Sequence, residues 1–389
     1  MLRFWQTCRP TAATTRTVDK RSFIGNNPIR LIQEPLIMKK TLTALLLTAV
    51  ALTAGCPSSS DRITLRNVSY DPTREFYREF NEAFIQHYKK ETGENVRIEV
   101  THGGSSKQAR DVIGGLEADV VTLALAYDID NIAEQAGLLP MNWQERLPYN
   151  STPYSSTVVF LVRKGNPKNI KEWEDIIRPD VEIVVADPKT SGVARWAYLA
   201  GWGYVLKREL GDLKKLHDPA AAADVAAAQE KAKEFITALY KNVNIFSAGA
   251  RGASLVFVQQ GNGDVLLDWE NQAKLTINEF DSDGYEIVVP SVSILAEPPV
   301  AILDKHVDKR GTRKIAEAYL NFLYTKEGQD IVAKHYYRPR DEEILQKYRD
   351  NFVEVEMFTI DDVFGGWREA QQTHFEPGGV FDQIYVPVQ

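Results

Sequence analysis

An α/β protein of two lobes is the fold class that this sequence predicts, because short strand-like runs alternate with longer helical runs. The alternation extends from Ile63 to Ala126 and starts again at the apolar run of residues 157–162. At 389 residues, with 44% hydrophobic and 25% charged side chains, the chain is long enough for a large core and two domains. We therefore expect the second lobe to begin near residue 156.

In the first lobe, predicted strands and helices follow one another without long loops. Strand-like runs cover residues 63–68, 96–100 and 120–126, with helical patterns from Pro72 and up to Ile113 between them. Four aromatic side chains recur at a spacing of four and so share one face of the first helix: Phe76, Phe80, Phe84 and Tyr88. We interpret this face as core packing rather than as a ligand stack.

The second lobe repeats the pattern. After residues 157–162, the run of residues 181–185 predicts another strand, and a long helical pattern follows it. The Ala-rich, charged segment 218–238 predicts a solvent-facing helix. A glycine turn at residues 248–254 precedes a further helical pattern, and a later strand ends at Trp269.

The N-terminal part has the features of an export signal. Met38-Lys39-Lys40 is basic, and the following residues up to 55 are apolar and end in small residues, which predicts a signal peptide over residues 38–56. Residues 1–37 have no apolar periodicity and would place the basic region in mid-chain. We interpret residues 1–37 as a mis-assigned N-terminal extension, with Met38 as the initiator.

The chain has two cysteines, Cys8 and Cys56, so we expect the exported domain to have no disulfide, thiolate metal site or cysteine nucleophile. Cys56 ends the apolar region and resembles the acylated cysteine of a lipoprotein cleavage site. That pattern prefers Leu, Val or Ile where this chain has Thr53. We predict a lipid anchor at Cys56, with ordinary cleavage near Ala54 as the alternative.

Charge argues against polyanionic partners. Residues 1–55 contain eight basic and two acidic side chains, so residues 56–389 retain 38 basic and 51 acidic ones and a net charge near −13. A protein of this charge is a poor candidate for binding nucleic acid or an anionic membrane surface. Any small anion must therefore be held by local groups.

Three turns have the composition of an anion site. Residues 187–196, with Ser191 and Gly192 at the tip, follow one predicted strand, and residues 102–107, with Ser105, follow another. Such turns leave the first backbone N–H groups of a helix unpaired, with the positive end of the helix dipole behind them. The turn before Ala250 is of the same type. We expect these turns to form the walls of one site.

Several motifs together resemble the periplasmic sulfate-binding proteins of bacterial ABC importers. The resemblance spans about residues 61–385 and rests on residues 67–75, 102–105, 121–128, 187–196, 249–252, 268–271 and 294–300. It implies a type II periplasmic binding protein fold, in which two α/β lobes close over the ligand. Lobe 1 is then expected to comprise residues 61–155 and 300–389, and lobe 2 residues 156–299.

The resemblance also implies the ligand contacts. Sulfate is held in the family by groups that correspond here to a donor at Ser105, the hydroxyl of Ser191, the backbone N–H groups of Gly192, Val193 and Ala250, and the indole N–H of Trp269. The turn usually has a second glycine where this chain has Val193. A β-branched residue would be strained there if the position needed a positive φ.

Four further residues are expected to support the site rather than to bind the anion. We interpret Arg195 and Arg251 as bracing the turns through backbone and carboxylate bonds. His102 is expected to orient its turn by hydrogen bonding rather than to act as a base. Asp71 is interpreted as a helix N-cap before Pro72 that also supports the site.

Sulfate carries no proton at neutral pH and therefore requires only donors, whereas phosphate keeps a proton and is better served by a pocket with one acceptor. Together with these donor-rich turns, the family resemblance implies a monomeric sulfate receptor of the periplasm that delivers its ligand to the permease subunits and ATPase of an ABC importer. Thiosulfate, phosphate and molybdate are alternative ligands. A serine hydrolase is a distant alternative, because Gly-x-Ser-x-Gly is absent. No cofactor or metal is predicted.

Overall fold

The computed structural model describes residues 62–280 and 283–385, which lie within one compact unit. The predicted N-terminal extension, the signal peptide and the lipidation site at Cys56 lie outside the described residues. Within the described part, no helix is both long and apolar enough to span a membrane.

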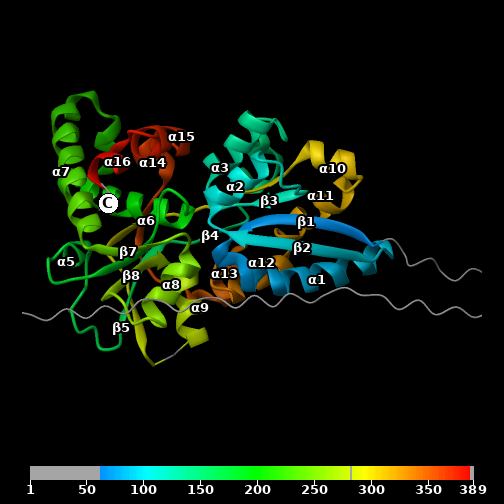
Figure 1. The fold of residues 1–389 in the computed structure, drawn as a ribbon, viewed down its shortest axis with the longest axis horizontal. Helices are drawn as coiled ribbons and strands as arrows, with labels where there is room; N and C mark the ends of the chain where they lie inside the picture. The colour runs from blue at the N-terminus through cyan, green and yellow to red at the C-terminus, as the bar shows by residue number, and fades with distance from the viewer. Residues whose placement is uncertain (1–61, 281–282, 386–389) are drawn as a thin grey trace, which may run out of the picture. The chain divides into compact units, whose positions relative to one another are not determined.

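The first sheet has four strands in the order β11-β3-β1-β2 (Figure 1). Strand β1 pairs in parallel with β2 and β3, whereas β11 pairs with β3 in the antiparallel direction. Helices α1 and α12 lie on one side of this sheet, and α2 and α3 lie on the other. The elements of this lobe are β1 (Ile63–Tyr70), α1 (Arg74–Thr92), β2 (Val96–Gly103), α2 (Ser105–Ile113), β3 (Val120–Thr122), α3 (Ala126–Asn131), β11 (Val300–Ile302), α10 (Asp304–Arg310), α11 (Arg313–Phe322), α12 (Lys326–Lys334) and α13 (Glu342–Lys347).

The aromatic face of α1 is core, as predicted. Phe76, Phe80 and Phe84 are fully buried, and the rings of Phe80 and Phe84 lie 5.3 and 5.1 Å from that of Tyr319 on α11. Burying each large apolar side chain stabilises the fold by about 1.5–3 kcal/mol. The helix ends at Gly93, whose φ of 76° is the left-handed conformation typical of a helix C-terminus.

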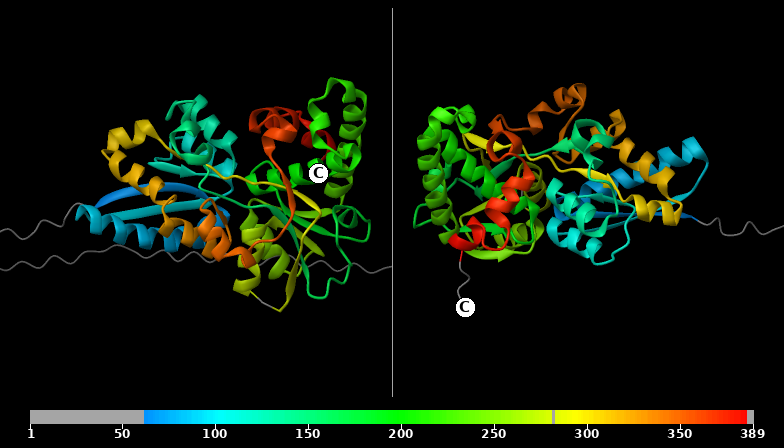
Figure 2. Two further views of the ribbon diagram at one scale, coloured as in Figure 1. Left: turned by 180° about the vertical axis from the view of Figure 1, so that it is seen from behind. Right: turned by 90° about the horizontal axis from the view of Figure 1, so that it is seen from above.

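The second sheet has five strands in the order β7-β6-β8-β5-β9. Strand β6 is parallel to β7 and β8, whereas β5 runs antiparallel to β8 and β9. Helices α6 and α7 lie on one face and α8 and α9 on the other (Figure 2). The elements are β5 (Val158–Arg163), α5 (Trp173–Ile176), β6 (Ile183–Ala186), α6 (Gly192–Leu210), α7 (Ala222–Lys241), β7 (Val243–Ser247), α8 (Ala250–Val258), β8 (Val265–Trp269), α9 (Glu270–Phe280) and β9 (Tyr285–Val288).

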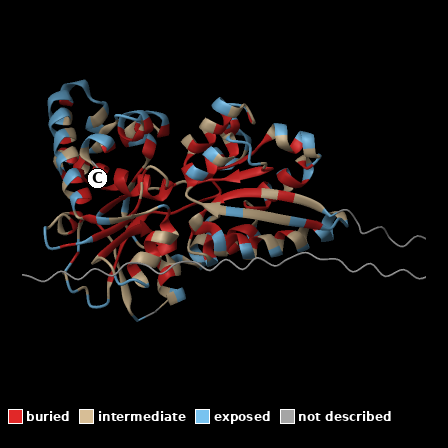
Figure 3. Cartoon of the chain, in the orientation of Figure 1, coloured by how far each residue is buried: buried red, intermediate tan, exposed pale blue. Residues whose placement is uncertain are grey.

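Helix α7 differs from the prediction that segment 218–238 faces solvent. Its outer face is exposed (Figure 3), but Ala228, Ala232, Phe235 and Ile236 are buried. These side chains recur every three or four residues, so they form one stripe, and the helix packs with it against α6. The charged residues of the segment obscured this stripe in the sequence.

The C-terminal segment packs on the second lobe. Strand β13 (Glu356–Phe358) pairs with β10 (Val292–Ile294), and α14 (Ile360–Phe364), α15 (Trp367–Ala370) and α16 (Val380–Ile384) follow it. The Trp196 ring of α6 lies 4.6 Å from that of Trp367, and the Tyr198 ring lies 5.0 Å from that of Phe375. The range 300–389 expected for lobe 1 therefore does not describe residues 356–385.

Three chain segments connect the lobes, and they pair with one another. Strand β4 (Tyr154–Ser155), which leads towards β5, pairs with β12 (Arg338–Pro339), which leads towards β13. Ser156 and Ala296 exchange two backbone hydrogen bonds of 2.9 Å, so the connection from β10 to β11 joins them. The shorter helical segments are Asp71–Thr73, Ile132–Ala136, Trp143–Arg146, α4 (Pro148–Ser151), Leu213–His217, Pro219–Ala221, Arg349–Asn351 and Gln371–Phe375.

Candidate functional site

Three helix N-termini converge on one small cavity. Helix α2 begins at Ser105, α6 at Gly192 and α8 at Ala250, and all three residues line one small, tightly closed cavity. The first N–H groups of a helix have no partner within the helix and carry the positive end of its dipole. The complete lining is Tyr70, Asp71, Pro72, Gly103, Gly104, Ser105, Ser191, Gly192, Val193 and Ala250.

Ser191 is the N-cap of α6 and retains a free donor. Its Oγ accepts the backbone N–H of Ala194 at 3.4 Å, and the residue is 2% exposed. Because the oxygen acts as an acceptor in this bond, the hydroxyl proton remains available for an anion. The N–H groups of Gly192 and Val193, the first two residues of the helix, lie beside it.

The strain expected at Val193 does not arise. Val193 is the second residue of α6, and it is not among the described residues with positive φ. A helical backbone accommodates a β-branched side chain, which is 4% exposed here. A second glycine is therefore not needed to present this N–H group.

Ser105 reaches the cavity, but its hydroxyl is already engaged. Its Oγ donates to Asp128 Oδ2 at 2.6 Å and accepts the Ala124 N–H at 3.0 Å. The donor that this residue can offer to an anion is therefore its backbone N–H. Asp128 is buried, and desolvation raises the pKa of its carboxyl despite the opposing charge of Arg195.

Sequence reasoning did not select Asp128 as a site residue. It lies in the motif of residues 121–128, just after β3, on the same edge of the sheet as Ser105. Its position at the carboxyl ends of parallel strands, where ligands commonly bind, could have identified Asp128 as a site residue.

Trp269 supplies a buried donor near the cavity. It is fully buried, and its indole N–H has no hydrogen-bond partner among the described residues. The indole does not itself line the cavity, but its ring packs edge-on against Tyr70, which does, with 5.7 Å between centroids. A buried, unpaired N–H costs about 1–3 kcal/mol, so its retention points to an acceptor.

Glycines allow the lobes to touch around the cavity. A Cβ on Gly104 of lobe 1 would lie 2.5 Å from the carbonyl oxygen of Thr190 and 2.8 Å from that of Ala248, both in lobe 2. A Cβ on Gly249 would overlap the carboxylate of Asp71. The structure is thus a closed arrangement in which backbone packs on backbone.

Asp71 does not occupy the N-cap position that the sequence predicted for it. The cap position before this short helix is Tyr70, with no side-chain cap bond, and Asp71 is its first residue. Its carboxylate lies 3.7 Å from Arg74. Burial raises the pKa of Asp71, and the charges of Arg74 and Arg251 oppose that rise. Because Asp71 lines the cavity, it places a carboxylate-bearing residue at the site.

The His102 ring hydrogen-bonds to the segment that ends β1 and begins the following short helix. Its Nδ1 lies 3.2 Å from the Tyr70 carbonyl oxygen and 3.3 Å from Thr73 Oγ1. A carbonyl can only accept, so this nitrogen carries the proton. Burial lowers the pKa of His102 to about 4, so the ring is neutral near pH 7.

The two predicted bracing arginines have the expected kinds of contact. Arg195 is 5% exposed; its Nε donates to the Pro188 carbonyl at 2.7 Å, and its terminal nitrogen Nη1 donates to Gln371 Oε1 at 2.9 Å. Arg251 forms a two-bond pair with Glu279 at 2.5 and 2.6 Å. Both side chains hold turns or neighbouring helices rather than standing free.

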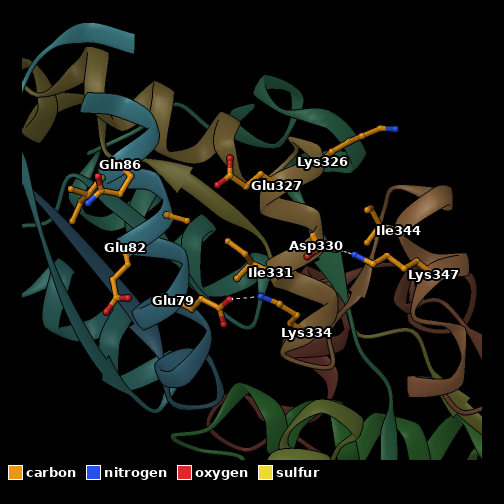
Figure 4. Close-up of a pocket in the computed structure, with 12 residues that line it drawn as sticks. Glu79, Glu82, Gln86, Lys326, Glu327, Asp330, Ile331, Lys334, Ile344 and Lys347 are labelled. Carbon is orange, nitrogen blue, oxygen red and sulfur yellow. Dashed lines mark hydrogen bonds and ion pairs between the residues drawn. The ribbon is translucent and has the colours of Figure 1, made fainter. Parts of the chain in front are cut away.

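A much larger hollow, of about 900 Å³, lies between α1 and the helices α12 and α13 (Figure 4). Four of its charged side chains form two ion pairs: Glu79 with Lys334 at 2.8 Å, and Asp330 with Lys347. None of the site residues predicted from the sequence lines it. The volume of a cavity therefore does not by itself identify the anion site in this molecule.

Comparison with known proteins agrees with this geometry. The profile of the family described as "Bacterial extracellular solute-binding protein" matches residues 65–338. The chain belongs to this family. The resemblance to sulfate-binding proteins is also confirmed: the sulfate-binding protein of Escherichia coli K12 is 55% identical over 322 residues, covering 83% of this chain and 93% of that protein.

Two further relatives bear on fold and ligand. The thiosulfate-binding protein of Pseudomonas aeruginosa is 49% identical over 350 residues, covering 90% of this chain and 100% of that protein. The solved structure of the sulfate-binding protein SubI from Mycobacterium tuberculosis aligns with a TM-score of 0.67 at 29% identity, covering 81% of this chain and 100% of that one. The two-lobed binding-protein fold predicted from the sequence is thus confirmed.

Proposed function

We propose that this protein captures sulfate in the cavity between its lobes and delivers it to an ABC importer. The observation that carries the proposal is that three helix N-termini converge on one cavity. Ser191 lies there as well, and its hydroxyl is available to donate a hydrogen bond. Sulfate offers acceptors only, and helix N-termini are favourable anion sites. The relatives named for sulfate and thiosulfate support the same class of ligand.

The proposed donors are the N–H groups of Ser105, Gly192, Val193 and Ala250, the hydroxyl of Ser191 and the indole N–H of Trp269. Charge-assisted hydrogen bonds of this kind contribute about 1.5–3 kcal/mol each, against a heavy desolvation cost for the dianion. Micromolar binding needs only about −8 kcal/mol net, which a handful of such bonds can supply.

Thiosulfate is the first alternative, because it has the same charge and nearly the same shape. Phosphate has a specific observation in its favour, since Asp71 lines the cavity and its carboxylate can accept a hydrogen bond from the P–OH group of phosphate. Molybdate also remains an alternative as a tetrahedral dianion.

Isothermal titration with sulfate, thiosulfate, phosphate and molybdate at two pH values tests the proposal. We expect one sulfate per chain, with an affinity that is flat between about pH 6 and 8, and no phosphate binding. Phosphate binding that disappears in Asp71→Asn would instead assign the site to phosphate. Absence of binding for all four anions would contradict the proposal.

The relatives are solute-binding proteins, and we propose that this protein likewise has no enzymatic turnover. Within the described residues, the hydroxyl of Ser105 bonds to Asp128 and the Nδ1 of His102 to Tyr70, so neither forms a serine–histidine pair with the other. Chromogenic esters and phosphoesters should therefore show no hydrolysis above background.

We further propose a periplasmic location, a lipid anchor at Cys56, a monomeric state, and the permease and ATPase of an importer as partners. The predicted signal peptide and the extracellular family support export. Mass spectrometry of the N-terminal peptide from cells decides the anchor, because acylation adds fatty-acid mass to Cys56.

A further inference from the structure

Arg340 lies in one of the three segments that connect the lobes, and its guanidinium contacts the other two. Arg340 follows β12 and donates through Nε to the Thr152 carbonyl at 3.0 Å and through a terminal nitrogen to Thr152 Oγ1 at 2.7 Å. The same nitrogen donates to Glu297 Oε1 at 2.6 Å. Thr152 precedes β4 and Glu297 lies between β10 and β11. The motif around Glu297 is part of the family resemblance but has no place in the anion cavity.

An aromatic ring covers this guanidinium. The Tyr149 ring lies 5.1 Å from the guanidinium carbon, a distance typical of a cation–π contact. Tyr149, Asn150 and Ser151 have φ of 55°, 53° and 60°, the left-handed region that non-glycine residues rarely adopt. Three consecutive residues in this region cost conformational free energy, so surrounding contacts must maintain the turn.

Such contacts are present. Ser151 Oγ donates to the Gln144 carbonyl at 3.0 Å, and the Thr152 N–H donates to the Tyr149 carbonyl at 3.1 Å. The turn thereby fixes Tyr149 over Arg340, although the tyrosine itself is 57% exposed. The side chain of Arg340 is only 16% exposed and that of Glu297 29%, so their ion pair is shielded from water more than most surface pairs.

We propose that Arg340 is a positioning residue that holds the three connections in the closed arrangement of the lobes. Thr152, Glu297 and Tyr149 complete this group, which we call the hinge clamp. A planar guanidinium suits the task because its five donors have fixed directions, so two chain segments bound to it cannot shift independently.

The hinge clamp acts on ligand binding without touching the ligand. The cavity exists only where the Gly104 turn of lobe 1 meets the Thr190 and Ala248 carbonyls of lobe 2. If the hinge loosens, these surfaces separate more often, and the closed, binding-competent state becomes less populated. The apparent affinity for the ligand then falls in proportion to that population. The inference rests on the proposed function only in its choice of sulfate as the probe.

Amide hydrogen exchange of the sulfate-free protein tests the hinge clamp directly. In Arg340→Ala we expect exchange in peptides covering residues 152–158 and 293–298 to be at least about fivefold faster, because the Ser156–Ala296 hydrogen bonds lose their support. Peptides of the first sheet around residues 119–124 should be unchanged. Arg340→Lys, which keeps the charge but not the fork, should lie between Arg340→Ala and the wild type.

Sulfate kinetics provide the second readout. Stopped-flow tryptophan fluorescence should show sulfate dissociating about three- to thirtyfold faster from Arg340→Ala, with the association rate constant within about twofold. Arg313→Ala is the matched control, because Arg313 bonds at 2.7 Å to Asp308 and Asp304, all within one lobe. This control should lower thermal stability without changing hinge exchange or sulfate release.

The outcomes separate the two proposals. The hinge-clamp proposal is wrong if amide exchange at the hinge and sulfate release in Arg340→Ala stay within about twofold of wild type. It is also wrong if Arg313→Ala changes both quantities as much as Arg340→Ala does. If Arg340→Ala does not fold, Glu297→Gln and Thr152→Val each remove one contact and should shift both readouts in the same direction. A wild-type protein that fails to bind sulfate contradicts the proposed function, while exchange in its sulfate-free form still decides the hinge clamp.

Discussion

At the scale of single residues, Trp269 provides the sharpest test of the site. Trp269→Phe keeps an aromatic ring beside Tyr70 but removes the unpaired indole N–H. If this group binds the anion, sulfate affinity should fall by about 10- to 150-fold, the equivalent of a hydrogen bond to a charged group worth about 1.5–3 kcal/mol. Titration calorimetry measures the loss.

Trp202→Phe is the matched control, because its indole N–H donates to Gln229 on α7 at 2.7 Å, away from the cavity lining. This variant should bind sulfate like the wild type. Unchanged affinity in Trp269→Phe would remove the indole from the set of ligand contacts.

The neighbouring Asp268 predicts a pH effect on stability. Desolvation raises the pKa of this buried carboxyl from 3.8 to about 8, although it accepts bonds from the Trp269 N–H at 2.8 Å and from Ser254. Between about pH 4 and 8 the folded state therefore keeps a proton that the unfolded state has lost, so stability falls as the pH rises.

Asp268→Asn should remove this contribution. The unfolding free energy should then fall less steeply over about pH 5–8, by up to about 1.4 kcal/mol per pH unit. Denaturant unfolding at several pH values measures the slope. Asp224→Asn, at an exposed position of α7, should leave it unchanged. A slope for Asp268→Asn that parallels the wild type would mean that Asp268 is already ionised in the folded protein.

At the scale of secondary-structure elements, closure depends on the absence of a side chain before α2. Gly104→Ala would place its Cβ 2.5 Å from the Thr190 carbonyl, an overlap that arises only when the lobes meet. Overpacking of this kind costs about 1–3 kcal/mol, so sulfate affinity should fall by about 5- to 150-fold with little change in thermal stability. Gly114→Ala, at the other end of α2 and outside the cavity lining, is the control, because its Cβ would approach only the Arg110 and Asp111 carbonyls of its own helix, at 3.2 and 3.5 Å. Equal affinities for the two variants would show that closure tolerates the extra carbon.

The first turn of α6 separates backbone from side-chain contributions. In Val193→Gly the N–H group stays in place, so sulfate affinity should remain within about threefold of wild type. Loss of the buried side chain should lower the unfolding free energy by about 2 kcal/mol, measured by denaturant titration. An affinity gain of about tenfold would instead show that valine restrains this turn.

The elements also show what the sequence could and could not predict. The starts of α2, α6 and α8 follow from local signals, a strand followed by a Ser/Gly turn and a helical pattern, and all three are confirmed. The engagement of the Ser105 hydroxyl by Asp128 was missed, because those residues are 23 positions apart and meet only once the sheet forms. The packing of Trp367 on Trp196 was missed for the same reason, since no local pattern encodes a contact across 171 residues.

At the scale of the whole molecule, the protein carries net negative charge and yet is proposed to bind a dianion. The formal charge is −7 for the full chain, and it is more negative without the basic N-terminal region. The cavity lining includes no basic side chain; of the nearby cations, Arg74 lies 3.7 Å from the Asp71 carboxylate, and Arg251 is paired with Glu279. Long-range electrostatics should therefore oppose the approach of sulfate, and only the oriented N–H groups at close range should favour it.

This balance predicts an unusual salt dependence. The Debye length falls from about 30 Å at 0.01 M ionic strength to about 8 Å at 0.15 M, which screens the repulsion but leaves short, buried hydrogen bonds almost unaffected. The association rate constant for sulfate should therefore rise about two- to fivefold over this range, whereas the dissociation rate constant should stay nearly constant. Stopped-flow tryptophan fluorescence in sodium chloride measures both, and choline chloride at equal ionic strength should give the same rise. An association rate that falls with salt would show that Arg74 and Arg251 steer the anion and that their field, rather than the net charge, governs its entry.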